Sequence, residues 1–206
     1  PASTATQPVN NPGEALEPYK TRQSEVGLKY DGGRFGGSVG VYQSRKPIGG
    51  IENNTFKVVD HQENLGLELT AFGQPVSGLS VLGGISLLDA DVDGQEAIGS
   101  PSTQANLGLD WMVPGVNGLS LDGRVIYTSE QYADLANTQE VPSWTRLDLG
   151  ARYTTFINDA QQLTLRARVE NVADRDYWAS AGGFPGSGYL TVGAPRTLIV
   201  STTLDF

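Results

Sequence analysis

The sequence predicts an all-β fold of about nine antiparallel strands in up-and-down order, and three observations lead to this prediction. Apolar and polar residues alternate along most of the 206 residues, as they do where successive side chains of a strand point to opposite faces of a sheet. Short turns and long polar segments alternate between these stretches. No stretch has the spacing of an amphipathic helix, and no apolar run reaches the roughly 18 residues of a transmembrane helix.

The alternating stretches define the individual strands. In the stretch that best shows the alternation, Leu147 and Leu149 share one face while Asp148 lies on the other. The stretches are longer than the typical globular strand of about 5–6 residues, which favours a membrane barrel. We predict strands over residues 21–31, 34–45, 62–73, 78–90, 103–113, 118–131, 144–156, 161–172 and 194–206.

The connections between these strands fall into two classes. Short turns rich in Gly, Pro, Asn and Asp are expected at residues 31–33, 74–77, 114–117 and 158–159. Long polar loops are expected near residues 46–61, 91–102, 132–143 and 173–193. Barrels of the outer membrane have short periplasmic turns and longer extracellular loops. A soluble sandwich has no physical reason to sort its connections in this way, so the sequence favours a segment of a transmembrane β-barrel.

Aromatic side chains on the apolar face support a barrel that crosses a bilayer. Aromatic rings are enriched where a barrel meets lipid headgroups, so we expect an interfacial girdle at the periplasmic rim. Phe72 and Phe156 lie near the same rim with the opposite parity, and the core of a soluble β protein is the alternative interpretation. The expected girdle residues, each beside a short turn or at the end of the sequence, are Tyr30, Phe35, Trp111, Tyr153 and Phe206.

The overall composition limits the possible partners and the domain organisation. A net charge of −9 argues against nucleic acid, because phosphate binding relies on clustered Lys and Arg. The absence of Cys is compatible with an oxidising compartment but is not specific to one. Residues 1–20 are polar and without periodicity, and we expect a remnant of an extracellular loop there, followed by a barrel segment over residues 21–206.

Several sequence motifs, most of them in the last third of the chain, resemble those of a known protein family. They are the runs at residues 144–153 and 165–172, the element Asn-Val-Ala-Asp-Arg-Asp-Tyr at residues 171–177, and a final strand that ends in Phe206. The stretch at residues 16–30 adds an upstream match. Together they resemble the C-terminal barrel of the TonB-dependent siderophore receptors of the bacterial outer membrane, over most of residues 16–206.

This resemblance implies a 22-stranded barrel with a plugged lumen. Nine strands are too few for it, and an open sheet would leave two unpaired edges that a bilayer does not tolerate. We therefore expect part of a larger receptor, without the plug domain and without the segment that contacts TonB.

The resemblance also implies a function. The outer loops would capture a ferric siderophore, and TonB would drive its import by rearranging the plug. Expected partners are the ferric siderophore, outer-membrane lipid, and TonB and the plug through the missing N-terminal part; no cofactor and no enzyme activity are expected. A soluble β-sandwich or lectin-like binding module and a passive outer-membrane pore are the alternatives.

Charged residues concentrate on the polar face of the strands over 144–172. Facing opposite charges stabilise a sheet by roughly 0.2–1 kcal/mol each, so we predict a register with Asp148 opposite Arg168 and Arg146 opposite Glu170, and a turn centred on Asn158. These charges are interpreted either as a structural ladder in a wet lumen or as contacts to a plug. The predicted lumen ladder consists of Arg146, Asp148, Arg152, Arg166, Arg168 and Glu170.

The last long loop holds the candidate ligand contacts. Aromatic faces at a barrel mouth can stack on a siderophore scaffold, and Arg175 or Lys46 can meet an anionic chelate. For Tyr177 and Trp178, packing where the strand leaves the membrane is the alternative interpretation. Tyr132 and Trp144 are expected in an outer girdle. The candidate ligand residues are Arg175, Tyr177, Trp178, Phe184 and Tyr189.

No metal site and no catalytic site is predicted. Residues 89–94 match the first half of a calcium loop, but Ser100 stands where the bidentate acid is expected, which favours an exposed acidic loop. His61 is the only histidine and the chain has no Cys, so a site built from several His ligands is unavailable. His61 also has no glycine-flanked nucleophile nearby, so a Ser-His-Asp triad is not expected.

Overall fold

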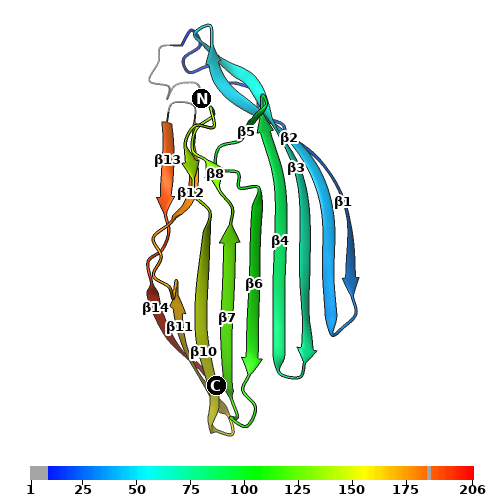
Figure 1. Ribbon diagram of the computed structural model, residues 1–206, viewed down its shortest axis with the longest axis vertical. Coiled ribbons are helices and arrows are strands. Elements are labelled where there is room, and N and C mark those ends of the chain that lie inside the picture. Colours follow the sequence, from blue (N-terminus) through cyan, green and yellow to red (C-terminus); the bar gives the residue numbers. More distant parts are fainter. Residues whose placement is uncertain (1–8, 185–186) are drawn as a thin grey trace.

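A single curved antiparallel sheet makes up most of the molecule (Figure 1). The computed structural model describes residues 9–184 and 187–206. Nine strands follow one another in the order β1-β2-β3-β4-β6-β7-β10-β11-β14, so every long strand pairs with its neighbours in the chain. Short β5 pairs with β4 outside this path. The prediction of nine up-and-down strands is confirmed.

The sheet strands match the predicted ranges closely, apart from the extension of two of them. They are β1 (Arg22–Asp31), β2 (Phe35–Glu52), β3 (Thr55–Val76), β4 (Leu79–Val92), β6 (Thr103–Met112), β7 (Leu119–Thr128), β10 (Trp144–Asn158), β11 (Gln161–Glu170) and β14 (Thr197–Asp205). Five shorter strands lie in the loops: β5 (Gln95–Glu96), β8 (Gln131–Tyr132), β9 (Glu140–Val141), β12 (Trp178–Phe184) and β13 (Ser187–Val192).

The four short turns predicted from the sequence lie at one end of the sheet, and three of the four predicted long connections lie at the other (Figure 1). Gly33 and Gly78 sit in the first two turns with φ values of +78° and +82°, which glycine adopts without the steric cost of a Cβ. The chain therefore changes direction within a few residues at this end. The predicted separation into two classes of connection is confirmed for these seven connections and is wrong for the one at residues 46–61.

The expected loop at residues 46–61 is instead a continuation of the β2–β3 hairpin, so this prediction was wrong. Asn53 and Asn54 have φ values of +50° and +57°, as a two-residue type I′ hairpin turn requires. Glu52 pairs with Thr55 directly beside that turn. A β-bulge between Ile48 and Gly49 interrupts the alternation of faces, which hid the strand in the sequence.

The segment before β1 is held against the tip of this hairpin. The side-chain amide of Asn11 donates to the carbonyl oxygen of Phe56 at 2.9 Å, and its oxygen accepts from the Phe56 backbone N–H at 2.9 Å. The Asn11 side chain thus pairs with both backbone groups of Phe56, as a residue of a neighbouring strand would. The predicted loop remnant over residues 1–20 includes residues 1–8, which lie outside the described part of the chain.

The two faces of the sheet differ in polarity. One row on the outer face runs Leu28, Val39, Leu69 and Ile85 across four strands, and all four side chains are exposed. Within the described residues only four hydrophobic side chains are buried, and all are small or lie at the loop end: Ala90, Ala97, Val141 and Ala181.

A soluble sandwich would bury the apolar rows between two sheets. Here the only other sheets in the described part of the chain are the small pairs β8–β9 and β12–β13, which lie at the loop end (Figure 1). The sandwich alternative is therefore wrong. The described residues also contain no helix with the length and hydropathy to cross a bilayer.

Candidate functional site

The predicted lumen charges lie on the inner face of β10 and β11, but the predicted register between these strands is wrong. Arg152 is opposite Arg166, and Gly150 is opposite Arg168. Asn158 pairs with Gln161, so the turn residues are Asp159 and Ala160 and the turn is not centred on Asn158. The Asn158 side chain accepts from the Ala160 backbone N–H at 3.0 Å, which stabilises the turn.

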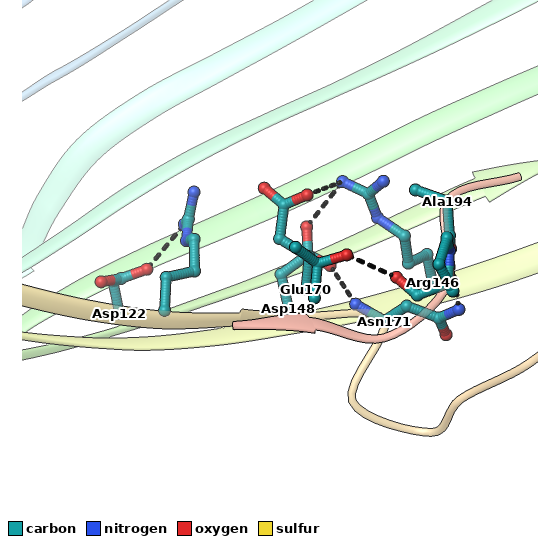
Figure 2. A network of polar contacts seen from close by, with 9 residues as sticks. Asp122, Arg146, Asp148, Glu170, Asn171 and Ala194 are labelled. Atoms are coloured by element: carbon teal, nitrogen blue, oxygen red, sulfur yellow. Dashed lines mark hydrogen bonds and ion pairs between the residues drawn. The ribbon is translucent and has the colours of Figure 1, made fainter. Parts of the chain in front are cut away.

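Arg168 finds its acidic partner two strands away. Its Nη2 lies 2.6 Å from Oδ2 of Asp122 on β7, and Gly150 of β10 lies between them in the same row (Figure 2). A Cβ at Gly150 would lie 2.4 Å from Oδ1 of Asp122. The missing side chain of this glycine therefore leaves the path open for the ion pair.

Arg152 also pairs with an acid two strands away, displaced by two residues along β6 from the row of Arg152. Its Nη2 lies 3.2 Å from Oδ2 of Asp110 on β6 and donates to Oγ of Ser120 on β7 at 3.2 Å. The small serine is the residue opposite Arg152 in the pair β7–β10. The acids Asp110 and Asp122 were missed from the sequence, although both share the inner parity of the predicted ladder.

Asp148 is a fully buried carboxylate at the upper end of this ladder. Its Oδ2 lies 2.9 Å from Nη2 of Arg146, and its Oδ1 accepts from the backbone N–H of Asn171 at 3.0 Å (Figure 2). Arg146 also approaches Glu170 to 3.9 Å. A buried charge is tolerated only when it is paired and hydrogen-bonded, and Asp148 meets both conditions.

Asn171 joins the two ends of the last loop at this point. It is 1% exposed and has φ = +51°. Its Nδ2 donates to the carbonyl oxygens of Arg175 at 2.8 Å and Ala194 at 3.1 Å, and its Oδ1 accepts from the Arg175 backbone N–H at 3.1 Å. Asn171 begins the element at residues 171–177, so that motif has a defined structural role: it attaches the loop to the ladder through Asp148.

The predicted ligand residues are not gathered in one hollow. The Tyr177 ring packs on Trp144 with centroids 4.5 Å apart, at the loop end of β10. Trp178 and Tyr189 are 43% and 63% exposed. Arg175 is exposed, and Phe184 ends β12 with its side chain outside what the structure describes. Two hollows along the inner wall, of about 290 and 430 Å³, are lined by other residues.

The outer loops contact one another. The Asn137 side chain accepts from the Glu96 backbone N–H at 2.8 Å and donates to the Glu96 carbonyl oxygen at 3.0 Å, which joins two neighbouring loops. The buried side chain of Gln131 accepts from the Ala181 backbone N–H at 3.2 Å, which joins the β8–β9 loop to the last hairpin. The connections that follow β4, β7 and β11 are therefore joined to one another at this end of the sheet.

Asp134 organises the β8–β9 loop. The hydroxyl of Thr138 donates to its Oδ2 at 2.7 Å, and the Gln139 backbone N–H donates to its Oδ1 at 2.8 Å. These two hydrogen bonds stabilise the carboxylate and lower the pKa of Asp134 below its ordinary value of 3.8.

The expected girdle residues are all exposed on the outer face or at the end of the chain. Phe72 and Phe156 have the inner parity, since Phe72 pairs with Gly36 and Phe156 with Gln162. The exposed girdle residues are Tyr30, Phe35, Trp111, Tyr153 and Phe206.

A single up-and-down sheet with an apolar outer face and ion pairs on its inner face defines a class of protein, the outer-membrane β-barrels. Within that class the family model described as "TonB dependent receptor-like, beta-barrel" matches residues 2–172. The chain belongs to this family, whose members are proteins of the bacterial outer membrane. The resemblance seen in the sequence is confirmed.

Several similar proteins are named as receptors for siderophores. The chain is 36% identical to the ferrichrome receptor FcuA of Yersinia enterocolitica, covering 97% of this chain and 27% of the relative. It is 26% identical to the ferrioxamine B receptor of Salmonella typhimurium, covering 100% of this chain and 31% of the relative. The crystal structure of BauA, the ferric preacinetobactin receptor of Acinetobacter baumannii, superposes with a TM-score of 0.83 at 36% identity, over 96% of this chain and 31% of that one.

The chain thus spans less than a third of the length of these relatives. Its sheet corresponds to part of a barrel wall, with the outer loops that belong to that part.

Proposed function

We propose that the chain forms part of the wall and of the outer loops of a receptor that binds a ferric siderophore and imports it across the outer membrane. The observation that carries this proposal is the division of one sheet into an exposed apolar face and an ion-paired inner face, in a member of this receptor family. The names of the similar proteins support iron chelates as the cargo.

The partners follow from the same proposal. Lipid covers the outer face, with the five aromatic girdle residues at the headgroup level, and TonB and a plug act through the remainder of the receptor. The ferric ion is cargo held by its chelator and not a resident cofactor. The receptor makes and breaks no covalent bond, so we propose no enzyme activity.

The inner-wall charges serve the wall itself in this proposal. Arg146, Arg152 and Arg168 each have an acidic partner within the sheet, which supports a structural ladder over direct contact with a plug. Arg166 is the exception, since it has no ion pair within the described residues.

In the last loop, Trp178 and Tyr189 are the best candidates for siderophore contact. Both are exposed aromatic side chains on the β12–β13 hairpin at the outer end of the sheet. Tyr177 is less suited, because its ring already packs on Trp144. This difference separates a contact role from a packing role within one short segment.

An uptake experiment tests the cargo. Cells whose only siderophore receptor is the full-length protein should accumulate radioactive iron from ferrichrome, ferrioxamine B or preacinetobactin, and should lose this uptake when TonB is deleted. Correctly inserted receptor that transports none of these three chelates would contradict the proposal. Uptake that persists without TonB would instead indicate a passive pore.

A binding experiment tests the loop. In the full-length receptor, replacing Trp178 and Tyr189 by Ala should weaken binding of the transported chelate by at least about tenfold, since one stacked aromatic contributes on the order of 1 kcal/mol. Tyr19, 50% exposed on the segment before β1, is the matched control when replaced by Ala. Equal affinity of both variants and the wild type would exclude the hairpin from the binding site.

A further inference from the structure

Arg166 stands apart from the other ladder arginines. Within residues 9–184 and 187–206 it has no ion pair, whereas Arg146, Arg152 and Arg168 each have one. It is exposed on the inner face of β11 and lies opposite Arg152 on one side and Ser201 of β14 on the other. A guanidinium is always charged, and each of the other three ladder arginines meets an acidic partner on the inner face.

The wall shows how its arginines find such partners. Arg168 reaches over Gly150 to Asp122, and Arg152 reaches past Ser120 to Asp110. In both cases the partner lies two strands away, and the residue in the intervening strand is small. Length explains this geometry, because an arginine side chain spans more than the roughly 4.8 Å between neighbouring strands.

The same geometry can be applied to both sides of Arg166. Toward β10 it meets the like charge of Arg152, which disfavours an approach. Toward β14 it meets Ser201, a small residue like Gly150 and Ser120. Arg166 lines a hollow of about 430 Å³ that extends along the inner face from Asp110 and Asp122 to Ile199 and Ser201. The next position in the row lies beyond β14, where the sheet of this chain has its edge.

That edge needs a partner strand. β14 pairs with β11 on one side only within the described residues, and an unpaired strand edge is not tolerated in a bilayer. The similar receptors are more than three times as long as this chain, so the same receptor can supply the strand.

We propose that a strand from the part of the receptor beyond this chain pairs with the free edge of β14 and carries an acidic residue on its inner face, opposite Ser201 or one inner position to either side, which forms an ion pair with Arg166 across Ser201. This pair continues the inner-wall ladder over the junction that closes the barrel. The proposal rests on the barrel architecture and is independent of the cargo.

Cross-linking in the full-length receptor locates the partner strand. This chain contains no Cys, so Ser201→Cys can be combined with single Cys substitutions along the inner face of each candidate strand. A disulfide in native membranes is expected at one position, because facing residues of paired strands have the short Cβ separation that a disulfide needs. The proposal is overturned if no position cross-links, or if no Asp or Glu lies at the linked position or at the inner positions next to it.

A charge exchange then tests the ion pair. Arg166→Glu should lower the urea concentration at which the full-length receptor unfolds, and changing the identified acid to Lys in the same protein should restore most of the loss. Arg124→Gln and Arg166→Gln form the matched comparison, since Arg124 is also exposed on the inner face but lies within the sheet on β7. We expect only the Arg166 variant to reduce the fraction of closed barrel in unheated gels. Failure of the exchange to restore stability overturns the ion pair, even when iron uptake shows that the proposed function is correct.

Discussion

Gly150 provides a sharp test of the pairing across the inner wall. A Cβ at this position would lie 2.4 Å from Oδ1 of Asp122, whereas ordinary contacts begin at 3.4 Å. In Gly150→Ala the carboxylate must therefore withdraw by about 1 Å, which breaks the 2.6 Å contact with Arg168. The effect should appear as a loss of stability that depends on the carboxylate of Asp122.

The magnitude follows from two opposing contributions. Hydrogen bonds to charged groups contribute about 1.5–3 kcal/mol, and the exposed fractions of 37% for Arg168 and 26% for Asp122 reduce this to about 1–2 kcal/mol. Replacing Gly by Ala within a strand gains roughly 0.5–1 kcal/mol, because the unfolded chain loses freedom. We expect Gly150→Ala to destabilise the receptor by about 0–1.5 kcal/mol, with a central value of about 0.75 kcal/mol.

A double-mutant cycle separates the two contributions. In the Asp122→Ala background the ion pair is already lost and the three atoms nearest to the new methyl group are gone, so Gly150→Ala should stabilise by roughly 0.5–1 kcal/mol. Gly40→Ala is the matched control on the inner face of β2, since its Cβ would approach no atom closer than 3.8 Å. Urea unfolding of the full-length receptor in lipid vesicles measures all four proteins and the control. The reasoning is refuted if Gly150→Ala has the same effect in both backgrounds.

Three further predictions concern the loops of the full-length receptor. Asn171→Ala should make the segment 172–194 on intact cells roughly tenfold more sensitive to protease, because the amide that joins its two ends is lost, while the barrel remains resistant; equal cleavage of both proteins would contradict this. Asn137→Ala should speed hydrogen exchange at Glu96 without changing the strands, and unchanged exchange would show that the contact does not hold the loops together. The pKa of Asp134 is lower in the folded loop than its ordinary 3.8. The ionised carboxylate therefore stabilises the loop fully above its ordinary pKa of 3.8, and this stabilisation is lost as the pH falls through the pKa of the folded state. Exchange of this loop measured between about pH 5 and pH 2 should therefore rise at the acidic end in the wild type but not in Asp134→Asn.

The strands and short turns could be predicted because their signals are local. Alternation and turn residues are properties of a few neighbouring positions, and they gave the nine strands and the end of the sheet at which each turn lies. The long β2–β3 hairpin was missed because Pro47 and the bulge at Gly49 interrupt the alternation. The adjacent residues Asn53 and Asn54 were the available signal, since both tolerate the left-handed conformation of a hairpin turn.

The partners of the inner charges could not be predicted from one hairpin. Parity placed Arg168 on the correct face, but its acid Asp122 lies more than 40 residues away in sequence, on a strand that β11 does not touch. Finding it requires the registers of two strand pairs together and the recognition that Gly150 leaves an opening. The ligand contacts depend on how separate loops come together, which no local pattern specifies.

The ion pairs that span three strands also determine where this wall is mechanically weakest. Separating β14 from β11 breaks their backbone hydrogen bonds and, at the loop end, the exposed ion pair of Arg196 with Asp174 and the hydrogen bond of Asn171 to Ala194. Within the described residues no ion pair of the inner face joins these two strands. Separating β11 from β10 must in addition pull Arg168 from Asp122 and Glu170 from Arg146. If separation of the strands starts at the edge of β14, it should therefore stop after this one strand, because the ion pairs hold the remaining strands together.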